Sequence, residues 1–221
     1  MPSRLPLFPL SAVLLPHAVL PLHVFEERYR LLVAELLALP EPERVFGVVA
    51  IRSGREVGAD GVRALHDVGC AAQLVRADEH ADGRFDIVTT GGRRFALRAV
   101  DHDRPYLVGT VDWLDDPTGT GDVAALDAAV RTSYDGYVAA LRTAGADATP
   151  APLPDDPAAL SYAVAGSMLL DLGVRQDLLA EPDVCARLRS EQSLLRREAR
   201  LIGELSALPA PDLTRVPLGL N

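Results

Sequence analysis

The side chains best suited to chemistry in this chain are one serine among small residues and five histidines. Ser167 lies in AGSML, which lacks the G-x-S-x-G spacing of a nucleophile elbow, so we expect its hydroxyl to pack rather than react. The histidines include no i, i+4 pair and no H-E-x-x-H sequence. They are His17, His23, His66, His80 and His102. The spacing therefore predicts no metal site and no cofactor.

The basic residues exclude two further kinds of active site. All 22 are arginine, because the sequence contains no lysine. A phosphate-binding G-x-x-x-x-G-K-[ST] loop needs its lysine, and a Ser-Lys protease needs a lysine as base. We therefore predict that the chain is not an enzyme of either class. A hydrolase built on a Ser/His/Asp or two-carboxylate cluster is the remaining catalytic alternative.

The charge and the cysteine content limit the partners and the cellular compartment that we expect for this chain. The net charge of −9 argues against a nucleic-acid surface or an anionic membrane as partner. Cys70 and Cys185 lie far apart, which favours two buried thiols over a disulfide or a reactive thiol. The first 25 residues do not resemble a cleaved leader, so a reducing cytoplasm is the expected compartment.

The apolar opening must be extended. Pro6, Pro9, Pro16 and Pro21 interrupt residues 5–25, and each proline removes an amide donor and would cost about 3 kcal/mol inside a helix. Strands with prolines at their starts or edges fit this pattern. From Glu26 the period becomes helical, and Pro40 ends that helix.

Alternating apolar segments follow as far as residue 116. We expect strands at 45–51, 68–74, 85–89, 95–100 and 107–113. Turn sequences separate them, including Gly91-Gly92 between the third and fourth. The spacing is typical of a closed or nearly closed sheet.

The period changes to 3.6 beyond Gly121. A helix is expected after Asp122, a plausible N-cap, and another over 160–172, which starts near Asp155 or Asp156 and ends at Gly173. A short helix at 176–179 and a long one from Asp183 to about residue 208 complete this part.

The last helix carries charges within its apolar stripe. Arg187, Glu191 and Glu198 project there, and buried charges are costly unless paired. Arg187 and Glu191 have the spacing to pair directly. For Glu198 we expect a partner among Arg28, Arg93 and Arg94. These residues form either a polar rim between helix and sheet or a ligand-facing site.

The opening also carries a family resemblance. The strings LPLFPL, LLP and LPLHVFEERYRLLV resemble the amino-terminal, substrate-binding domain of Lon proteases, and FGVVAI, VGCAAQL and PYLVGTVDWLDD follow in the same order. The resemblance implies an α+β fold in which an amino-terminal PUA-like β-barrel packs against a helical bundle. We assign residues 1–117 to the barrel lobe, 118–208 to the helical lobe and 209–221 to a carboxy-terminal tail.

Two binding functions are open at this point. The resemblance implies a non-catalytic module that binds apolar segments of unfolded or client polypeptides, with a separate ATP-dependent protease or chaperone as an optional partner and homo-oligomerisation left open. Its recognition run matches Phe25, Glu26, Arg28 and Tyr29. The alternative is a small-ligand or RNA binder that uses Arg93, Arg94 and Phe95, because guanidinium and aromatic groups suit bases and phosphates.

Overall fold

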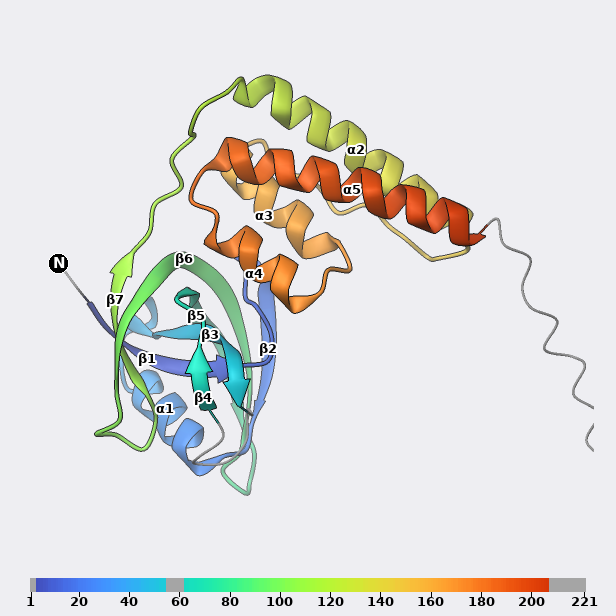
Figure 1. Ribbon diagram of the computed structural model, residues 1–221. Coiled ribbons are helices and arrows are strands. Elements are labelled where there is room, and N and C mark those ends of the chain that lie inside the picture. The colour runs from blue at the N-terminus through green and yellow to red at the C-terminus, as the bar shows by residue number, and fades with distance from the viewer. Residues whose placement is uncertain (1–2, 55–61, 207–221) are drawn as a thin grey trace, which may run out of the picture.

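The proline-rich opening forms two strands. A computed structural model describes residues 3–54 and 62–206 (Figure 1). In it, β1 (Ser3–Leu10) and β2 (Val19–Val24) contain Pro6 and Pro21 at paired positions within the sheet. The helix that follows is α1 (Glu27–Leu37), and a 3-10 turn, η1 (Glu41–Glu43), comes after Pro40. The extended opening and the position of the first helix are therefore as predicted.

The sheet closes on itself through β1. Its further strands are β3 (Val45–Gly54), β4 (Val62–Leu65), β5 (Val68–Glu79), β6 (Phe85–Asp101) and β7 (Val108–Trp113). The first half of β1 pairs antiparallel with β7 and its second half pairs parallel with β3, which closes the ring β1-β7-β6-β5-β3. β2 is attached to β6, and β4 to β3. The ring is not a regular barrel, because it contains a parallel pair and several register shifts.

The predicted turn at Gly91-Gly92 is wrong. Both glycines lie inside the continuous strand β6, which replaces the two strands expected at 85–89 and 95–100. Gly91 gives room for the loop between β1 and β2: its N–H donates to the Ala18 carbonyl at 2.8 Å, and its own carbonyl accepts from the His17 N–H at 2.8 Å. A glycine in a strand can mark a close backbone approach as well as a turn.

Helix α1 packs against the ring on the side away from the other helices (Figure 1). Its buried face consists of Tyr29, Leu32, Val33 and Leu36. Tyr29 stacks on Phe8 of β1 with ring centroids 4.1 Å apart. This helix therefore shares its apolar core with the first strand.

Four helices complete the fold, which is α+β as predicted. They are α2 (Val123–Thr143), α3 (Pro157–Ser167), α4 (Leu172–Ala180) and α5 (Val184–Ser206). Asp122, Asp156 and Asp183 each accept a backbone N–H at a helix start. Figure 1 shows α2 and α5 side by side, with α4 nearest the sheet. Among the described residues, no helix is long and apolar enough to cross a membrane.

The helix expected over 160–172 is interrupted. Helix α3 ends at Ser167, Met168 is extended, and Asp171 caps α4 by accepting the Val174 N–H at 2.9 Å. Gly173, expected as a stop, lies within α4. Asp171, as an N-cap, thus begins a new helix at a point where the uniformly apolar sequence suggested that one helix continued. The predicted end near residue 208 and the tail at 209–221 lie outside the described residues.

We expect Gly91→Ala to destabilise the protein by about 3 kcal/mol, because overpacking against backbone is poorly relieved. A Cβ at Gly91 would lie 2.1 Å from the Leu15 carbonyl oxygen, whereas one at Gly92 would be 3.6 Å from its nearest neighbour. Urea unfolding of both alanine variants checks this. Equal stability of the two variants would contradict the close-approach role of Gly91.

Candidate functional site

Two arginines are fully buried between the sheet and the helices, and Asp116 lies between them. Arg94 of β6 donates to Asp116 Oδ1 at 2.8 Å, and Arg187 of α5 donates to the same oxygen at 3.0 Å. The side chains of both arginines are 0% exposed. Asp116 belongs to the segment between β7 and α2. One carboxylate therefore connects a strand, a linker and the last helix.

Neighbouring groups complete this buried network. Arg94 also donates to the carbonyls of Leu179 and Glu181 at 2.7 and 3.1 Å, and Arg187 donates to the Glu181 carbonyl at 2.7 Å. The Tyr162 hydroxyl donates to Asp116, and the Arg187 guanidinium lies 4.1 Å from the centre of the Tyr162 ring. Burial is the main cause that raises the pKa of Tyr162, so its proton stays in the network. These contacts form a structural network that links the sheet, the linker and the helices, and we call this network the joint.

The predicted Arg187–Glu191 ion pair is replaced by this network. Arg187 pairs with Asp116 and donates to Ser161 Oγ, while neither Glu191 oxygen has a hydrogen-bond partner of ordinary geometry among the described residues. Burial raises the pKa of Glu191 well above its usual value, although Arg187 and Ser161 lower it in part. An α-helical i, i+4 spacing permits a pair but does not require one.

The partners expected for Glu198 are wrong. Its carboxylate pairs with Arg197, the preceding residue, at 2.9 Å, and not with Arg28, Arg93 or Arg94. The side chain is one quarter exposed. Glu198 thus needs no partner from the sheet.

The recognition run after β2 is divided between core and surface. Tyr29 is buried, whereas Phe25 is 50% exposed. Glu26 and Arg28 form an ion pair at 3.0 Å, and the Arg28 guanidinium lies 4.6 Å from the centre of the Tyr29 ring. The structure therefore places Phe25 where a partner can reach it and Tyr29 where it holds α1.

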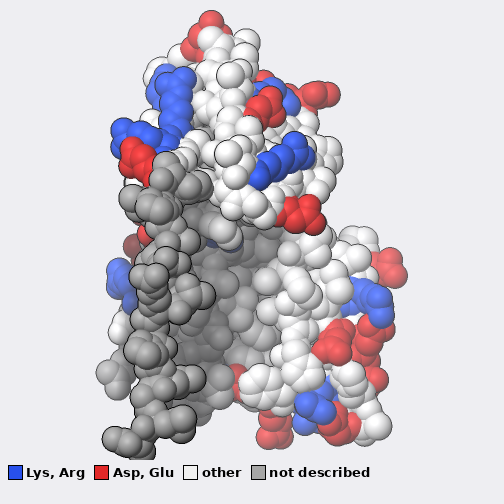
Figure 2. Space-filling view, turned by 90° about the vertical axis from the view of Figure 1, so that its right-hand side faces the viewer, with Lys and Arg blue, Asp and Glu red and all other residues white. Residues whose placement is uncertain are grey.

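The second predicted group is also divided. Arg94 and Phe95 are buried, and only Arg93 reaches the surface. Arg93 pairs with Asp115 at 2.9 Å and lies 5.5 Å from the centre of the Trp113 ring. The three residues do not present the joint surface on which the RNA-binding alternative was based. On the face in Figure 2, acidic and basic side chains are intermingled.

An apolar groove runs between the end of α1 and β1. Two adjoining hollows of about 560 and 500 Å³ share Arg4, Pro6, Leu36 and Leu39. We call them together the α1–β1 groove. Its apolar lining also includes Leu5, Leu32, Val45, Ala71, Tyr106, Val108 and Trp113. Arg93 lines one of the two hollows, so one of the predicted site residues contributes to this groove.

Three arginines around the groove are each paired with a carboxylate, whereas Glu43, which also lines it, pairs with none of them. Arg4 pairs with Asp101, Arg93 with Asp115, and Arg104 with Glu35 at 2.6 Å. Glu35 also accepts from the Tyr106 hydroxyl. Because these partners neutralise one another, the groove has an apolar floor without a rim of one charge.

The cysteines and Ser167 have structural positions. Cys70 and Cys185 are free and buried, as predicted, and burial raises the pKa of Cys70 to about 12. The Ser167 hydroxyl donates to the Val164 carbonyl of its own helix at 2.8 Å. The Cys70 thiol is held protonated and the Ser167 hydroxyl is held by its own helix, which is the opposite of an activated nucleophile.

Asp116 and Ser161 were missed from the sequence as parts of the buried network. Asp116 stands beside Asp115 in a linker, and no local pattern tells the partly buried aspartate of the network from the exposed one. Ser161 lies in an apolar helix, where small residues indicated packing alone. The sequence did contain one signal of this network: charged residues within the apolar stripe of the last helix. That signal correctly identified Arg187 as needing a partner.

These features define an α+β domain with an apolar groove beside its first strand, and comparison with known proteins places it in a family. The family model described as the ATP-dependent protease La (LON) substrate-binding domain matches residues 4–197. The chain belongs to this family.

Individual relatives agree with that assignment. Lon protease 2 of Syntrophobacter fumaroxidans is 27% identical over 90% of this chain, and Lon protease 2 of Herpetosiphon aurantiacus is 30% identical over 88%. The chain spans about a quarter of the length of each. The Lon N-terminal domain protein from Xanthomonas campestris is 27% identical, with a TM-score of 0.63 over 86% of this chain and 98% of that one. The N-terminal domain of Mycobacterium avium complex Lon protease shares the fold at 19% identity, with a TM-score of 0.60 over 90% of this chain and 98% of that one.

We expect Asp116→Asn to lower the free energy of unfolding by about 3–5 kcal/mol, because it leaves two buried guanidinium groups without a counter-charge. Asp115→Asn is the matched control: its side chain is 88% exposed, so its loss should cost under about 1 kcal/mol. Urea unfolding of both variants measures the difference. A similar small loss in each would contradict the central role of Asp116.

The stability of the Glu191→Gln variant, relative to that of the wild type, should increase as the pH rises. In the unfolded chain the carboxyl titrates near 4.5, and in the folded protein its pKa is raised. The folded state therefore holds more protons above pH 4.5, so wild-type stability falls through the window between the two pKa values. The amide cannot ionise and lacks this loss. Urea midpoints of both proteins between pH 4 and 8 test this, and a constant difference would refute it.

Proposed function

We propose that this protein is a non-catalytic polypeptide-binding module whose α1–β1 groove takes apolar segments of unfolded or client proteins. The observation that carries the proposal is the groove itself, in which Leu36, Leu39 and Trp113 lie beside Pro6 of β1. Membership of a substrate-binding family supports the same reading.

The energetics of such a groove favour weak and broad binding. Burial of an apolar side chain contributes about 1.5–3 kcal/mol, from which the cost of ordering an extended peptide is subtracted. The groove is long enough to offer room to more than one side chain, since its two hollows adjoin. Several modest contacts, rather than one deep pocket, would hold a segment.

The paired charges on the rim support low selectivity. Arg4, Arg93 and Arg104 each have a carboxylate partner, so a bound segment does not need charges of its own. Breaking those pairs for a charged peptide would bring little gain, because exposed ion pairs are worth about 1 kcal/mol or less. Apolar character would then be the main property recognised.

A second contact region is proposed at Phe25. Its half-exposed ring borders a hollow of about 170 Å³ lined by Pro9, Leu10 and Leu22. Glu26 and Arg28 orient the start of α1 beside it. Arg187, Glu191 and Glu198 are assigned to the joint and the helix surface instead, with no role in binding.

The proposed partners follow from the relatives. Those proteins are named Lon proteases, and the chain matches about a quarter of their length. We propose that this module presents bound polypeptides to a separate ATP-dependent protease or chaperone in the cytoplasm. Turnover of ATP or cleavage of peptides by the purified chain would overturn its non-catalytic assignment.

Leu39→Asp should weaken binding to a permanently unfolded polypeptide at least about tenfold, because it places a charge on the apolar floor of the groove. The matched control is Leu201→Asp on α5, since Leu39 and Leu201 are both 40% exposed. Fluorescence anisotropy with a labelled, reduced and alkylated protein gives the affinities, and its folded counterpart serves as the negative ligand. Equal affinity of the two variants would assign binding to another surface, and equal negligible binding of wild type to both ligands would remove the proposed function.

A further inference from the structure

Three metal-ligating side chains meet on the strand-rich part, away from the α1–β1 groove. His23 on β2 lies directly opposite Asp86 on β6 in the antiparallel register, and His80 follows the last residue of β5. The hairpin from β5 to β6 fixes His80, because its N–H donates to the Arg84 carbonyl at 2.8 Å and its carbonyl accepts from Gly83 at 2.8 Å. Gly83 has a φ of 76°, which suits glycine in this tight turn.

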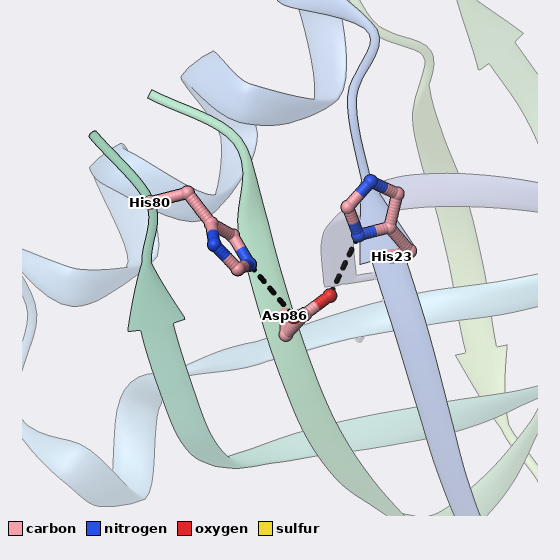
Figure 3. A group of neighbouring side chains, drawn as sticks. All are labelled: His23, His80 and Asp86. Carbon is pink, nitrogen blue, oxygen red and sulfur yellow. Dashed lines mark hydrogen bonds and ion pairs between the residues drawn. The ribbon is translucent and has the colours of Figure 1, made fainter. Parts of the chain in front are cut away.

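The geometry of the three side chains converges. The Nδ1 atom of His23 lies 2.6 Å from Asp86 Oδ1, and Nε2 of His80 lies 2.7 Å from Asp86 Oδ2. One ligand atom from each residue lies within 4.8 Å of the other two. Figure 3 shows the carboxylate between the two imidazoles, which approach it from opposite sides.

We propose that His23, His80 and Asp86 form a binding site for a divalent transition-metal ion of the Zn²⁺ class. Two imidazole nitrogens and one carboxylate suit Zn²⁺, Ni²⁺ or Cu²⁺ better than Mg²⁺ or Ca²⁺, which prefer sets of oxygen ligands. Ligand distances to Zn²⁺ are about 2.0–2.2 Å, so small side-chain rotations are enough to bring the three atoms around one ion. Three protein ligands leave at least one position for water or for a side chain of a bound partner.

The surroundings are compatible with an accessible, negatively charged site. The exposed fractions of the three side chains are 46%, 43% and 53% for His23, His80 and Asp86, so an ion can enter directly. A positive group, Arg84, is close to the site: its Nη1 lies 3.4 Å from His23 Nε2, and its Nε donates to Asp82 at 2.7 Å. Asp82 therefore offsets the positive charge of Arg84. It also remains a partner for the Arg84 guanidinium when an ion occupies the site.

The linear sequence conceals this arrangement. His23 and His80 are separated by 57 positions, and the expectation of no metal site was based on the absence of helical spacings such as H-E-x-x-H. The three residues are brought together by the pairing of strands and not by their spacing in the sequence. The three side chains lie outside the α1–β1 groove, although His23 also lines the hollow beside Phe25. The metal site does not depend on the proposed function.

Isothermal titration of the purified, tag-free chain with ZnCl₂ in a non-coordinating buffer tests the proposal. We expect one saturable site, no matching signal with MgCl₂, and binding weakened by at least about tenfold in each of His23→Ala, His80→Ala and Asp86→Asn. His102→Ala is the control, because His102 is also exposed but stands outside the site. All four side chains are at the surface, and circular dichroism confirms that the variants fold.

Nuclear magnetic resonance locates the ion independently. Zn²⁺ should shift the imidazole signals of His23 and His80 and leave that of His102 unchanged. Absence of saturable Zn²⁺ binding, or affinity that is the same in the site variants and in His102→Ala, would overturn the proposal.

Discussion

The shared carboxylate of Asp116 is the interaction on which the arrangement of the two halves depends. Two guanidinium groups with no exposed side-chain surface converge on one of its oxygens, from β6 and from α5. A buried ion pair is weak grounds for overall stability but strongly penalises the loss of one member. Its contacts connect a strand, a linker and a helix at one carboxylate. The network therefore connects the helices to the sheet rather than forming an open site.

The sequence predicted those elements whose signal is local. Pro6 and Pro21 identified an extended opening, and Asp122 and Asp183 marked helix starts at the observed residues. One error arose where a residue contacts a distant segment: Gly91 adapts to the β1–β2 loop rather than making a turn, and the neighbouring sequence does not show this. The other had a local signal, because Asp171 caps α4 through the Val174 N–H, but the apolar run around it indicated one continuous helix.

The candidate sites show the same limit. Phe25 and Tyr29 are four residues apart on one short run, yet one is half exposed and the other buried, because Phe25 precedes α1 whereas Tyr29 lies on the face of α1 that packs against β1. The α1–β1 groove joins residues from the first strand to Trp113, and the His23–His80–Asp86 group depends on the register of two strand pairs. Family resemblance indicated what kind of protein this is, but both candidate surfaces arise from long-range pairing.

The double pairing of β1 has a consequence for how the chain is made. Its second half can join β3 once about fifty residues have left the ribosome, but its first half must wait for β7, which ends at Trp113. Until then, one side of an apolar strand is without its neighbour. Such non-local closure slows folding and leaves a strand edge open to wrong association during synthesis. A protein that would handle unfolded chains thus passes through a stage in which it resembles one.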